Sequence, residues 1–336
     1  MEKRPMRSRI FRTCVILATA VPAFAAPKEC DRACLKSTLD QYLNAVIQHD
    51  PAAAPLFVGF RQTENAVVVR PGTGVWKTVT ALGKLQRRYL DPVSGQAGYF
   101  GTVEEQGEPA IVTVRLKVED RKITEAEWFL VHKGDPGLNG PPAPGQNAGN
   151  FFDPDNVTAH PPPDRIVPKD SRTSREALIA ITNSYFDGIT THDGSLIMAH
   201  PGCTRVENGN TVTGRPAGGR GRGPAPEAAA APGAVTDCTS GLATINIQNV
   251  AARRYPIVDE EAGVVLAIAV FLRKPGTPTR RNAFSEWFVI DNSKIRSIYS
   301  AMFYPPPEAP VPNWPPYEGN WPLPPTLAAP PAAPNR

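Results

Sequence analysis

Two glutamates and one arginine in the first half of the chain have the side chains that acid–base chemistry requires. Glu127 lies among apolar residues on one predicted strand, Arg115 lies on the strand before it, and Glu64 lies on an earlier strand. Burial among apolar neighbours raises the pKa of a carboxyl group, which can then hold or move a proton near neutral pH. A nearby arginine can hold an anionic intermediate. Glu64, Glu127 and Arg115 are therefore the catalytic candidates.

The same kind of side chain also has a structural interpretation, because a buried carboxylate is costly unless a cation pairs with it. The second half of the chain carries a comparable set, Arg205, Glu207 and Glu286, which we assign to substrate binding. A feature that both halves keep suits a requirement of a shared fold, whereas catalysis usually survives in one half. We therefore expect the acid–arginine pairs to be structural bridges first, with catalysis as the alternative.

These candidates belong to a stretch that occurs twice, at Leu35–Asn65 and Leu178–Asn208. The copies are 143 positions apart. Each copy also precedes a Glu-Trp-Phe triplet, at Glu127–Phe129 and Glu286–Phe288, and the triplets are 159 positions apart. The second offset is longer by 16, which predicts an insertion of that length in the second copy. The residue pairs at the shorter offset include Tyr42 and Tyr185, His49 and His192, Asp50 and Asp193, and Glu64 and Glu207.

Each copy has the pattern of helices followed by antiparallel strands, which indicates the α+β class. Apolar residues at helical spacing predict one helix over 30–49, capped by Asp31, and a second helix that follows the Ser174 cap and ends at about residue 191. In the first copy we expect a short helix or turn over 52–60 and strands over 60–69, 85–90, 97–104, 110–118 and 122–132. In the second copy we expect strands over 244–250, 253–258, 264–272, 284–290 and 294–302.

His49 and Asp50 follow the first predicted helix, and His192 and Asp193 follow the second. A histidine near the C-terminus of a helix interacts favourably with the helix dipole. We therefore expect these pairs to form caps and turns rather than to act as general bases.

The segment 1–25 has the composition of a secretory signal peptide, with cleavage near Ala25. Five basic residues precede an apolar run over 14–25, which is too short to span a bilayer as a stable helix. This segment carries the whole formal charge of +4, so the exported protein is neutral. We expect a secreted or periplasmic protein that neither binds nucleic acid nor inserts into a membrane.

Four cysteines remain after residue 25, and an even number in an exported chain favours disulfides. Four cysteines allow three pairings. Cys30 and Cys34 lie one turn apart at a helix start, and a bond between Cys203 and Cys238 would close the insertion, so these two pairs are favoured. The spacing lacks the paired ligands of a zinc site, so no metal is expected.

Changes in composition divide the rest of the chain. Domains are predicted over 28–133 and 172–304, with a Pro- and Gly-rich linker over 134–171. A low-complexity insertion over 214–234 interrupts the second domain, and a Pro-rich tail over 305–336 follows it.

The order of helix, His-Asp, strand and Glu-Asn, followed by a twisted sheet, resembles the SnoaL-like branch of the nuclear transport factor 2-like superfamily. More narrowly, the chain is similar to a family of exported, largely uncharacterised proteins from fungi and bacteria. The matching motifs are the Cys30 and Cys34 pair, Tyr-Leu-x-Ala over 42–45, Thr-Glu-Asn over 63–65, Gly-x-Gly-x-Trp over 72–76 and Arg-Leu-Lys-Val over 115–118. The second copy lacks Gly-x-Gly-x-Trp at the matching place.

The resemblance implies two tandem cone-shaped domains of the cystatin-like, SnoaL-like type, each with N-terminal helices packed on a curved antiparallel sheet around an apolar pocket. Tyr42 lies on the apolar stripe of its helix, so we expect a core side chain whose hydroxyl reaches the pocket of the first copy. We expect Trp76 to line the mouth of that pocket, and we assign both residues to substrate binding. The resemblance also implies that the two copies pair within one chain, as a monomeric pseudo-dimer.

These expectations lead to a hypothesis about function: an exported lyase, isomerase or hydrolase that acts on a small apolar or partly polar organic molecule by cofactor-independent acid–base chemistry. The alternatives are a secreted binding module for an apolar ligand or glycan, without catalysis, and a cell-envelope interaction protein that uses the Pro-rich tail. An enzyme needs an acid and a partner within about 3 Å at the pocket floor, with a raised carboxyl pKa. A binding module has carboxylates bridged away from the cavity.

Overall fold

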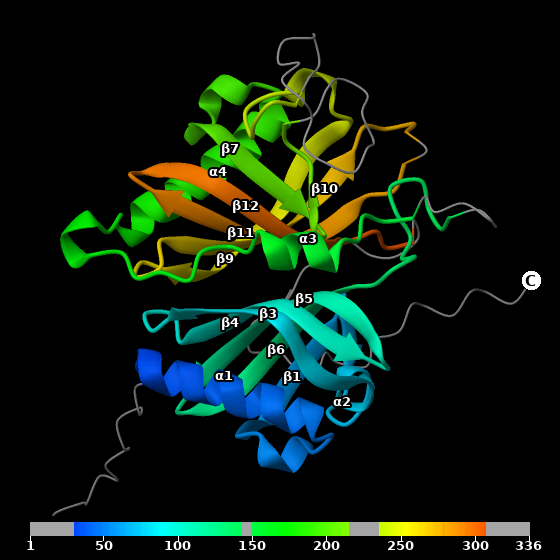
Figure 1. Ribbon diagram of the computed structural model, residues 1–336, viewed down its shortest axis with the longest axis vertical. Coiled ribbons are helices and arrows are strands. Elements are labelled where there is room, and N and C mark those ends of the chain that lie inside the picture. Colours follow the sequence, from blue (N-terminus) through cyan, green and yellow to red (C-terminus); the bar gives the residue numbers. More distant parts are fainter. Residues whose placement is uncertain (1–29, 143–148, 215–234, 278, 307–336) are drawn as a thin grey trace, which may run out of the picture.

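The structure, a computed structural model, describes residues 30–142, 149–214, 235–277 and 279–306. The predicted signal peptide, nearly all of the low-complexity insertion and nearly all of the Pro-rich tail lie outside these residues. The described elements form two groups of similar order, stacked along the longest axis of the molecule (Figure 1).

The first repeat contains helices α1 (Arg32–Ile47) and α2 (Val75–Thr78), the 3₁₀ turn η1 (Pro51–Ala53), and strands β1 (Leu56–Glu64), β2 (Val67–Val69), β3 (Val79–Asp91), β4 (Gln96–Glu105), β5 (Glu108–Glu119) and β6 (Lys122–Val131). The connection contains α3 (Pro154–Ala159) and η2 (Lys169–Ser171). The second repeat contains α4 (Arg175–Thr191), η3 (Gly194–Leu196), η4 (Leu242–Thr244), and strands β7 (Ala199–Glu207), β8 (Asn210–Thr211), β9 (Ile247–Asp259), β10 (Val264–Arg273), β11 (Asn282–Asp291) and β12 (Lys294–Phe303).

Each repeat forms a six-stranded sheet, and the strand orders correspond: β2-β1-β6-β5-β4-β3 and β8-β7-β12-β11-β10-β9. One long helix packs on each curved sheet, so the expected tandem α+β cone fold is confirmed (Figure 1). The expectation of wholly antiparallel sheets was wrong, because β1 runs parallel to β6 and β7 runs parallel to β12. The first strand of each repeat, β1 or β7, pairs with the last strand, β6 or β12, rather than with the next long strand, β3 or β9. In this pairing the first and last strands run in the same direction.

Some boundaries also differ from the expectation. Strand β1 begins at Leu56, inside the segment expected to be a helix or turn. Asn65 and Ala66 have φ angles of 46° and 65°, which make the tight hairpin turn to β2. The strands expected over 244–250 and 253–258 form one strand, β9, because the register shifts at Ala252 (φ 53°) as in a bulge and the strand continues beyond it.

The two long helices begin as the sequence predicts. The Asp31 carboxylate caps α1 by accepting the Cys34 N–H, and the Ser174 hydroxyl caps α4 by accepting the N–H of Ala177. The cores under them are separate clusters, one beneath α1 and one beneath α4. The disulfides join Cys30 to Cys34 and Cys203 to Cys238, the pairing that the sequence favours.

The histidines that follow these helices have turn roles. His49 and His192 have φ angles of 58° and 60°, in the left-handed region that ends a helix. The Nδ1 atom of His49 lies 2.8 Å from the carbonyl oxygen of Trp76, and that of His192 lies 3.0 Å from the carbonyl oxygen of Leu242. Each histidine therefore links the end of its helix to a short helical segment later in the same repeat.

A duplicated asparagine fixes the correspondence between the repeats. The side chain of Asn65 exchanges two hydrogen bonds with the backbone of Leu130, and that of Asn208 exchanges two with the backbone of Met302. Leu130 on β6 therefore corresponds to Met302 on β12, an offset of 172. The offset is 143 before the insertion and 172 after it, so the insertion is 29 residues long, not the 16 inferred from the Glu-Trp-Phe triplets. Those triplets lie on non-equivalent strands, β6 and β11.

The face of each sheet that is turned away from its helix packs against the other repeat. A third core cluster joins side chains of both sheets, with Tyr89 and Phe129 from the first and Trp287 and Tyr299 from the second. The ring centroids of Tyr89 and Trp287 are 5.0 Å apart, and the Trp287 indole N–H donates to the Thr113 hydroxyl at 2.9 Å. The two repeats therefore share one apolar interior between their sheets.

Two reciprocal ion pairs complete this contact. The Arg32 guanidinium donates to the Asp259 carboxylate at 2.8 and 2.9 Å, and Arg175, 143 positions after Arg32, donates to Asp91 at 2.8 Å. Each aspartate also accepts a backbone N–H from the opposite repeat, at 2.7 and 2.9 Å. The same patch of each repeat meets its counterpart, which is the geometry of a two-fold dimer built within one chain.

Candidate functional site

The interior of the first cone is occupied by its own side chains. The Tyr42 hydroxyl and the Trp76 indole N–H both donate to the Gln62 side-chain oxygen, at 2.9 and 2.8 Å. The Trp128 indole N–H donates to the Tyr42 hydroxyl at 2.9 Å. All four side chains are fully buried. Tyr42 therefore lies in the core, as expected, and Trp76, expected at a pocket mouth, is buried beside it.

Glu64 lies at the edge of this network. Its carboxylate accepts the backbone N–H of Val75 at 2.9 Å and the Gln62 side-chain amide at 3.0 Å. Burial raises the pKa of Glu64. Gly74 has a φ of 57°, and a side chain there would overlap the carboxylate. The Gly-x-Gly-x-Trp motif is thus the loop that contacts Glu64 and places Trp76 in the core.

Arg115 and Glu127 lie on the opposite face of the same sheet, toward the second repeat. Arg115 donates to Glu127 at 3.0 Å and to Glu125 at 2.7 Å, and Glu125 also pairs with Arg61. Glu127 accepts a further bond at 2.7 Å from Arg254 of the second repeat. Arg115, Glu125 and Glu127 are each 2% exposed. This cluster is a buried bridge between the repeats, and it does not meet Glu64.

His132, just after β6, belongs to a separate ion-pair cluster. Its Nε2 atom lies 2.7 Å from Glu105, and its Nδ1 atom lies 3.6 Å from Asp135. The hydrogen bonds to Asp135 and Glu105 raise the pKa of His132 to about 10. A histidine with a raised folded-state pKa stabilises the fold fully below its ordinary pKa, and this stabilisation is lost as the pH rises through the folded value.

We therefore expect His132→Gln to lower the free energy of unfolding most at pH 6, with a difference from wild type that shrinks toward pH 10. Urea unfolding at pH 6, 8 and 10 measures this difference. His160→Gln is the control, because the His160 imidazole contacts only a backbone carbonyl and is exposed. A difference that stays constant between pH 6 and 10 would contradict the prediction.

The second cone differs at the positions that fill the first. Arg205 corresponds to Gln62 by the repeat offset, and Ser300 takes the place of Trp128, since each pairs in register with the glutamate of its Glu-Asn motif. The second copy also has no Gly-x-Gly-x-Trp motif to insert a tryptophan here. The second repeat therefore has a small polar side chain at the position where the first repeat has a large ring.

A cavity of about 720 Å³ is present there. Its apolar wall comes mainly from Phe151, Ile245, Ile247, Phe271, Met302 and Tyr304. Its polar wall includes Arg205, Glu207, Asn246, Arg273 and Asn282. Residues of the connection between the repeats and residues of β7, β9, β10, β11 and β12 therefore meet around one space.

Arg205 joins two carboxylates at this cavity. It forms an ion pair with Glu207, and it donates to the fully buried Glu286 at 2.6 Å. Burial raises the pKa of Glu286, although Arg205 opposes the shift. The second carboxylate oxygen of Glu286 has no hydrogen-bond partner among the described residues. Of the sequence candidates, Arg205, Glu207 and Glu286 are thus brought together, and Arg205 and Glu207 line the cavity.

Three further cavity residues were missed in the sequence. Arg273 ends the long apolar strand β10, and its guanidinium donates to the Asn282 side-chain oxygen at 2.6 Å and to the Arg280 carbonyl at 3.1 Å. Burial raises the pKa of Tyr304 to about 12. The sequence pattern could have indicated Arg273, because it is the first charged residue after nine apolar ones. No pattern in the sequence indicates Asn282 or Tyr304.

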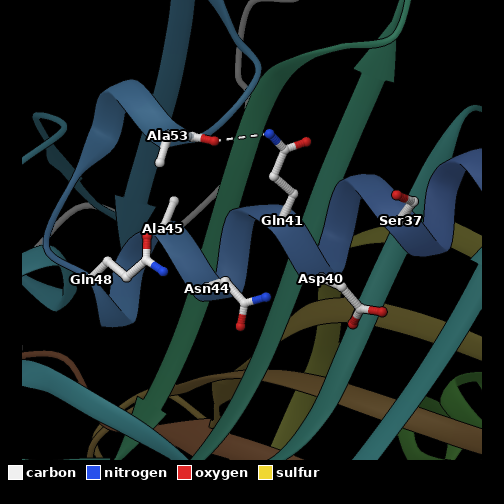
Figure 2. A pocket seen from close by; sticks show the side chains of 7 residues that line it. All are labelled: Ser37, Asp40, Gln41, Asn44, Ala45, Gln48 and Ala53. Atoms are coloured by element: carbon white, nitrogen blue, oxygen red, sulfur yellow. Dashed lines mark hydrogen bonds between the residues drawn. The ribbon is translucent and has the colours of Figure 1, made fainter.

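A second hollow lies on the outer surface of the first repeat. Figure 2 shows it along α1, lined by Ser37, Asp40, Gln41, Asn44, Ala45, Gln48 and Ala53. The Gln41 side chain donates to the Ala53 carbonyl across it, and Asp40 pairs with Lys36 and Arg88. The groove is smaller, at about 450 Å³, and no aromatic side chain lines it, so the cavity of the second repeat is the stronger candidate site.

Comparisons with known proteins give one family model and one similar solved structure. A family model described as a domain of unknown function (DUF8021) matches residues 171–302. Among solved structures, the chain is similar to an NTF2-like protein from Burkholderia xenovorans, with 16% identity, coverage of 38% of this chain and 91% of that chain, and a TM-score of 0.24. A comparison with curated proteins found no match.

Two observations concern cofactors and membranes. No group of three or more His, Cys, Asp or Glu side chains that could hold a metal ion occurs within the described residues. Among those residues there is also no helix that is long and apolar enough to cross a membrane.

Proposed function

We propose that the second repeat binds a small, partly apolar organic molecule in its cavity. The observation that carries this proposal is the space of about 720 Å³ lined by aromatic and aliphatic side chains together with Arg205 and Glu207. Ligand sites in proteins are concave and mostly apolar, with a few polar groups that fix orientation. The first repeat supports the fold instead, because Tyr42, Trp76 and Trp128 occupy its interior.

Acid–base conversion of the bound molecule is the second candidate function, and the Glu207–Arg205–Glu286 arrangement favours it. Glu207 lines the cavity, so its carboxylate can accept a proton from a bound molecule. Arg205 connects it to Glu286, a buried carboxyl group whose pKa is raised. An acid and a cationic partner thus lie within hydrogen-bonding distance beside the cavity, as an enzyme of this kind requires.

Export is part of the proposal. The two disulfides fit an oxidising compartment, and the basic, apolar and small-residue pattern of segment 1–25 fits a leader peptide. The mass of the protein recovered from outside the producing cell tests this, since cleavage near Ala25 sets the expected value.

A cavity-filling substitution tests the binding proposal. We expect Ile245→Trp to abolish the thermal stabilisation that small organic molecules give the wild-type protein, because the added ring occupies the cavity. The screen uses a library of aromatic and aliphatic acids, amides and alcohols, read by differential scanning fluorimetry. Asn44→Trp is the matched control, since it fills the outer groove along α1. The control variant should respond to ligands as wild type does.

Two results would decide against this function. Stabilisation that disappears in Asn44→Trp and persists in Ile245→Trp would move the site to the first repeat, and a library without any stabilising compound would remove the binding proposal. Products released from a stabilising compound, and lost in Glu207→Gln, would establish catalysis. Stabilisation without products would leave a binding module.

A further inference from the structure

Resting on the proposed function, we propose that the ligand is a monocarboxylate with an apolar body, and that Arg273 binds its carboxylate. Three observations support this: the charges around the cavity, the hydrogen bonds of the Arg273 guanidinium and the composition of the opposite wall.

The charges of the cavity are unequally paired. Arg205 is bound by two carboxylates, Glu207 and Glu286. The Arg273 guanidinium, in contrast, has neutral hydrogen-bond partners, the Asn282 side-chain oxygen and the Arg280 carbonyl, and within the described residues no carboxylate forms an ion pair with it. Burial lowers the pKa of Arg273. The Glu207 carboxylate acts on Arg273 through its charge, without a direct ion pair, and a bound carboxylate would supply that pair and offset the cost of burying the cation.

The guanidinium has donors left for a ligand. Arginine carries five N–H donors, and the two bonds described above use one at Nε and one at Nη2. Both donors of Nη1 and the second donor of Nη2 stay available. One donor from each of these nitrogens forms the fork that binds both oxygens of a carboxylate. Asn282 holds the guanidinium in place by its bond at 2.6 Å, so the fork is oriented before a ligand arrives.

The remaining wall suits an apolar body and a single negative charge. Phe151, Ile245, Phe271 and Tyr304 present aromatic and aliphatic surface to the same cavity. Glu207, which also lines it, would repel a second negative charge on the ligand. A monocarboxylate with a ring or a branched chain can therefore pack against the apolar wall and form an ion pair with Arg273.

The test compares aromatic monocarboxylates with their primary amides, which have nearly the same shape and no charge. Isothermal titration with 1-naphthylacetate and 1-naphthylacetamide, and with phenylacetate and phenylacetamide, gives the dissociation constants. We expect each acid to bind wild type about tenfold more tightly than its amide, from the charged hydrogen bonds to Arg273. Arg273→Gln should remove this preference, and Arg273→Lys should restore part of it.

Arg296→Gln is the control, because it removes a cation of the second repeat that is exposed and paired with Asp291. Its acid preference should equal that of wild type. Equal affinity of acids and amides for wild type, with both lost in Ile245→Trp, would overturn the assignment of Arg273 and leave the proposed function intact. If none of the four compounds binds wild type, the assignment of Arg273 is overturned as well. This comparison within wild type does not depend on the folding of a variant.

Discussion

Replacing Trp287 with alanine is expected to lower the free energy of unfolding by about 3–5 kcal/mol. The indole is fully buried between the two sheets, 5.0 Å from the ring of Tyr89, and donates a hydrogen bond to Thr113 of the other repeat. Alanine leaves a cavity in the shared interior and a hydroxyl group without its partner. Because both repeats contribute to this interior, the loss should affect the unfolding of the whole chain.

Chemical denaturation followed by circular dichroism measures this effect. Trp287→Phe is the matched variant, because it keeps an aromatic ring and loses the hydrogen bond, which is worth about 1 kcal/mol. Its loss of stability should be clearly smaller than that of the alanine variant. If both variants lose equally little, Trp287 does not hold the two repeats together, which contradicts the prediction.

Replacing Arg115 with methionine is expected to cost about 3 kcal/mol of stability, near the lower end for breaking a buried ion pair. The substitution removes the cation that lies between Glu125 and Glu127, all three of which are almost inaccessible to solvent. Arg61 and Arg254 each stay bonded to one of the two carboxylates, which limits the loss. The two negative charges nevertheless lie close together without the shared cation.

Urea unfolding of Arg115→Met and Arg296→Met separates buried from surface pairing. Arg296 also lies on a strand and pairs with Asp291, but its side chain is 49% exposed, and surface pairs contribute less than about 1 kcal/mol. A similar small loss in both variants would contradict the structural role given to Arg115, Glu125 and Glu127. A catalytic role would then be the alternative explanation for the burial of these three charged side chains.

The local parts of the fold could be predicted from the sequence. The caps Asp31 and Ser174, the apolar stripes of the long helices and the duplication each depend on residues close together in the chain. Strand pairing depends on distant residues, and there the sequence misled. The two Glu-Trp-Phe triplets are alike as letters, yet the Asn65 and Asn208 hydrogen bonds show that they lie on non-equivalent strands.

The site was harder to predict for a related reason. Alternation along the strand places Glu127 and Phe129 on one face, but it does not reveal that the other repeat covers that face. The cavity is lined by residues that lie far apart in the chain, from Phe151 of the connection to Arg205 of β7 and Tyr304 after β12, so local sequence patterns do not reveal it. Glu207 could be predicted because it repeats Glu64 at the offset of 143, and Arg205 lies two positions before it.

The reciprocal ion pairs of Arg32 with Asp259 and Arg175 with Asp91 have an evolutionary consequence. In a dimer of identical subunits, every substitution occurs on both sides of the axis, so a change that opens one cone opens both. Fusion into one chain removes that constraint while the same contacts persist. One half can then accumulate the rings that make it a rigid scaffold, and the other can lose them and specialise. Two copies within one chain can therefore divide their roles in a way that a symmetric assembly of identical subunits forbids.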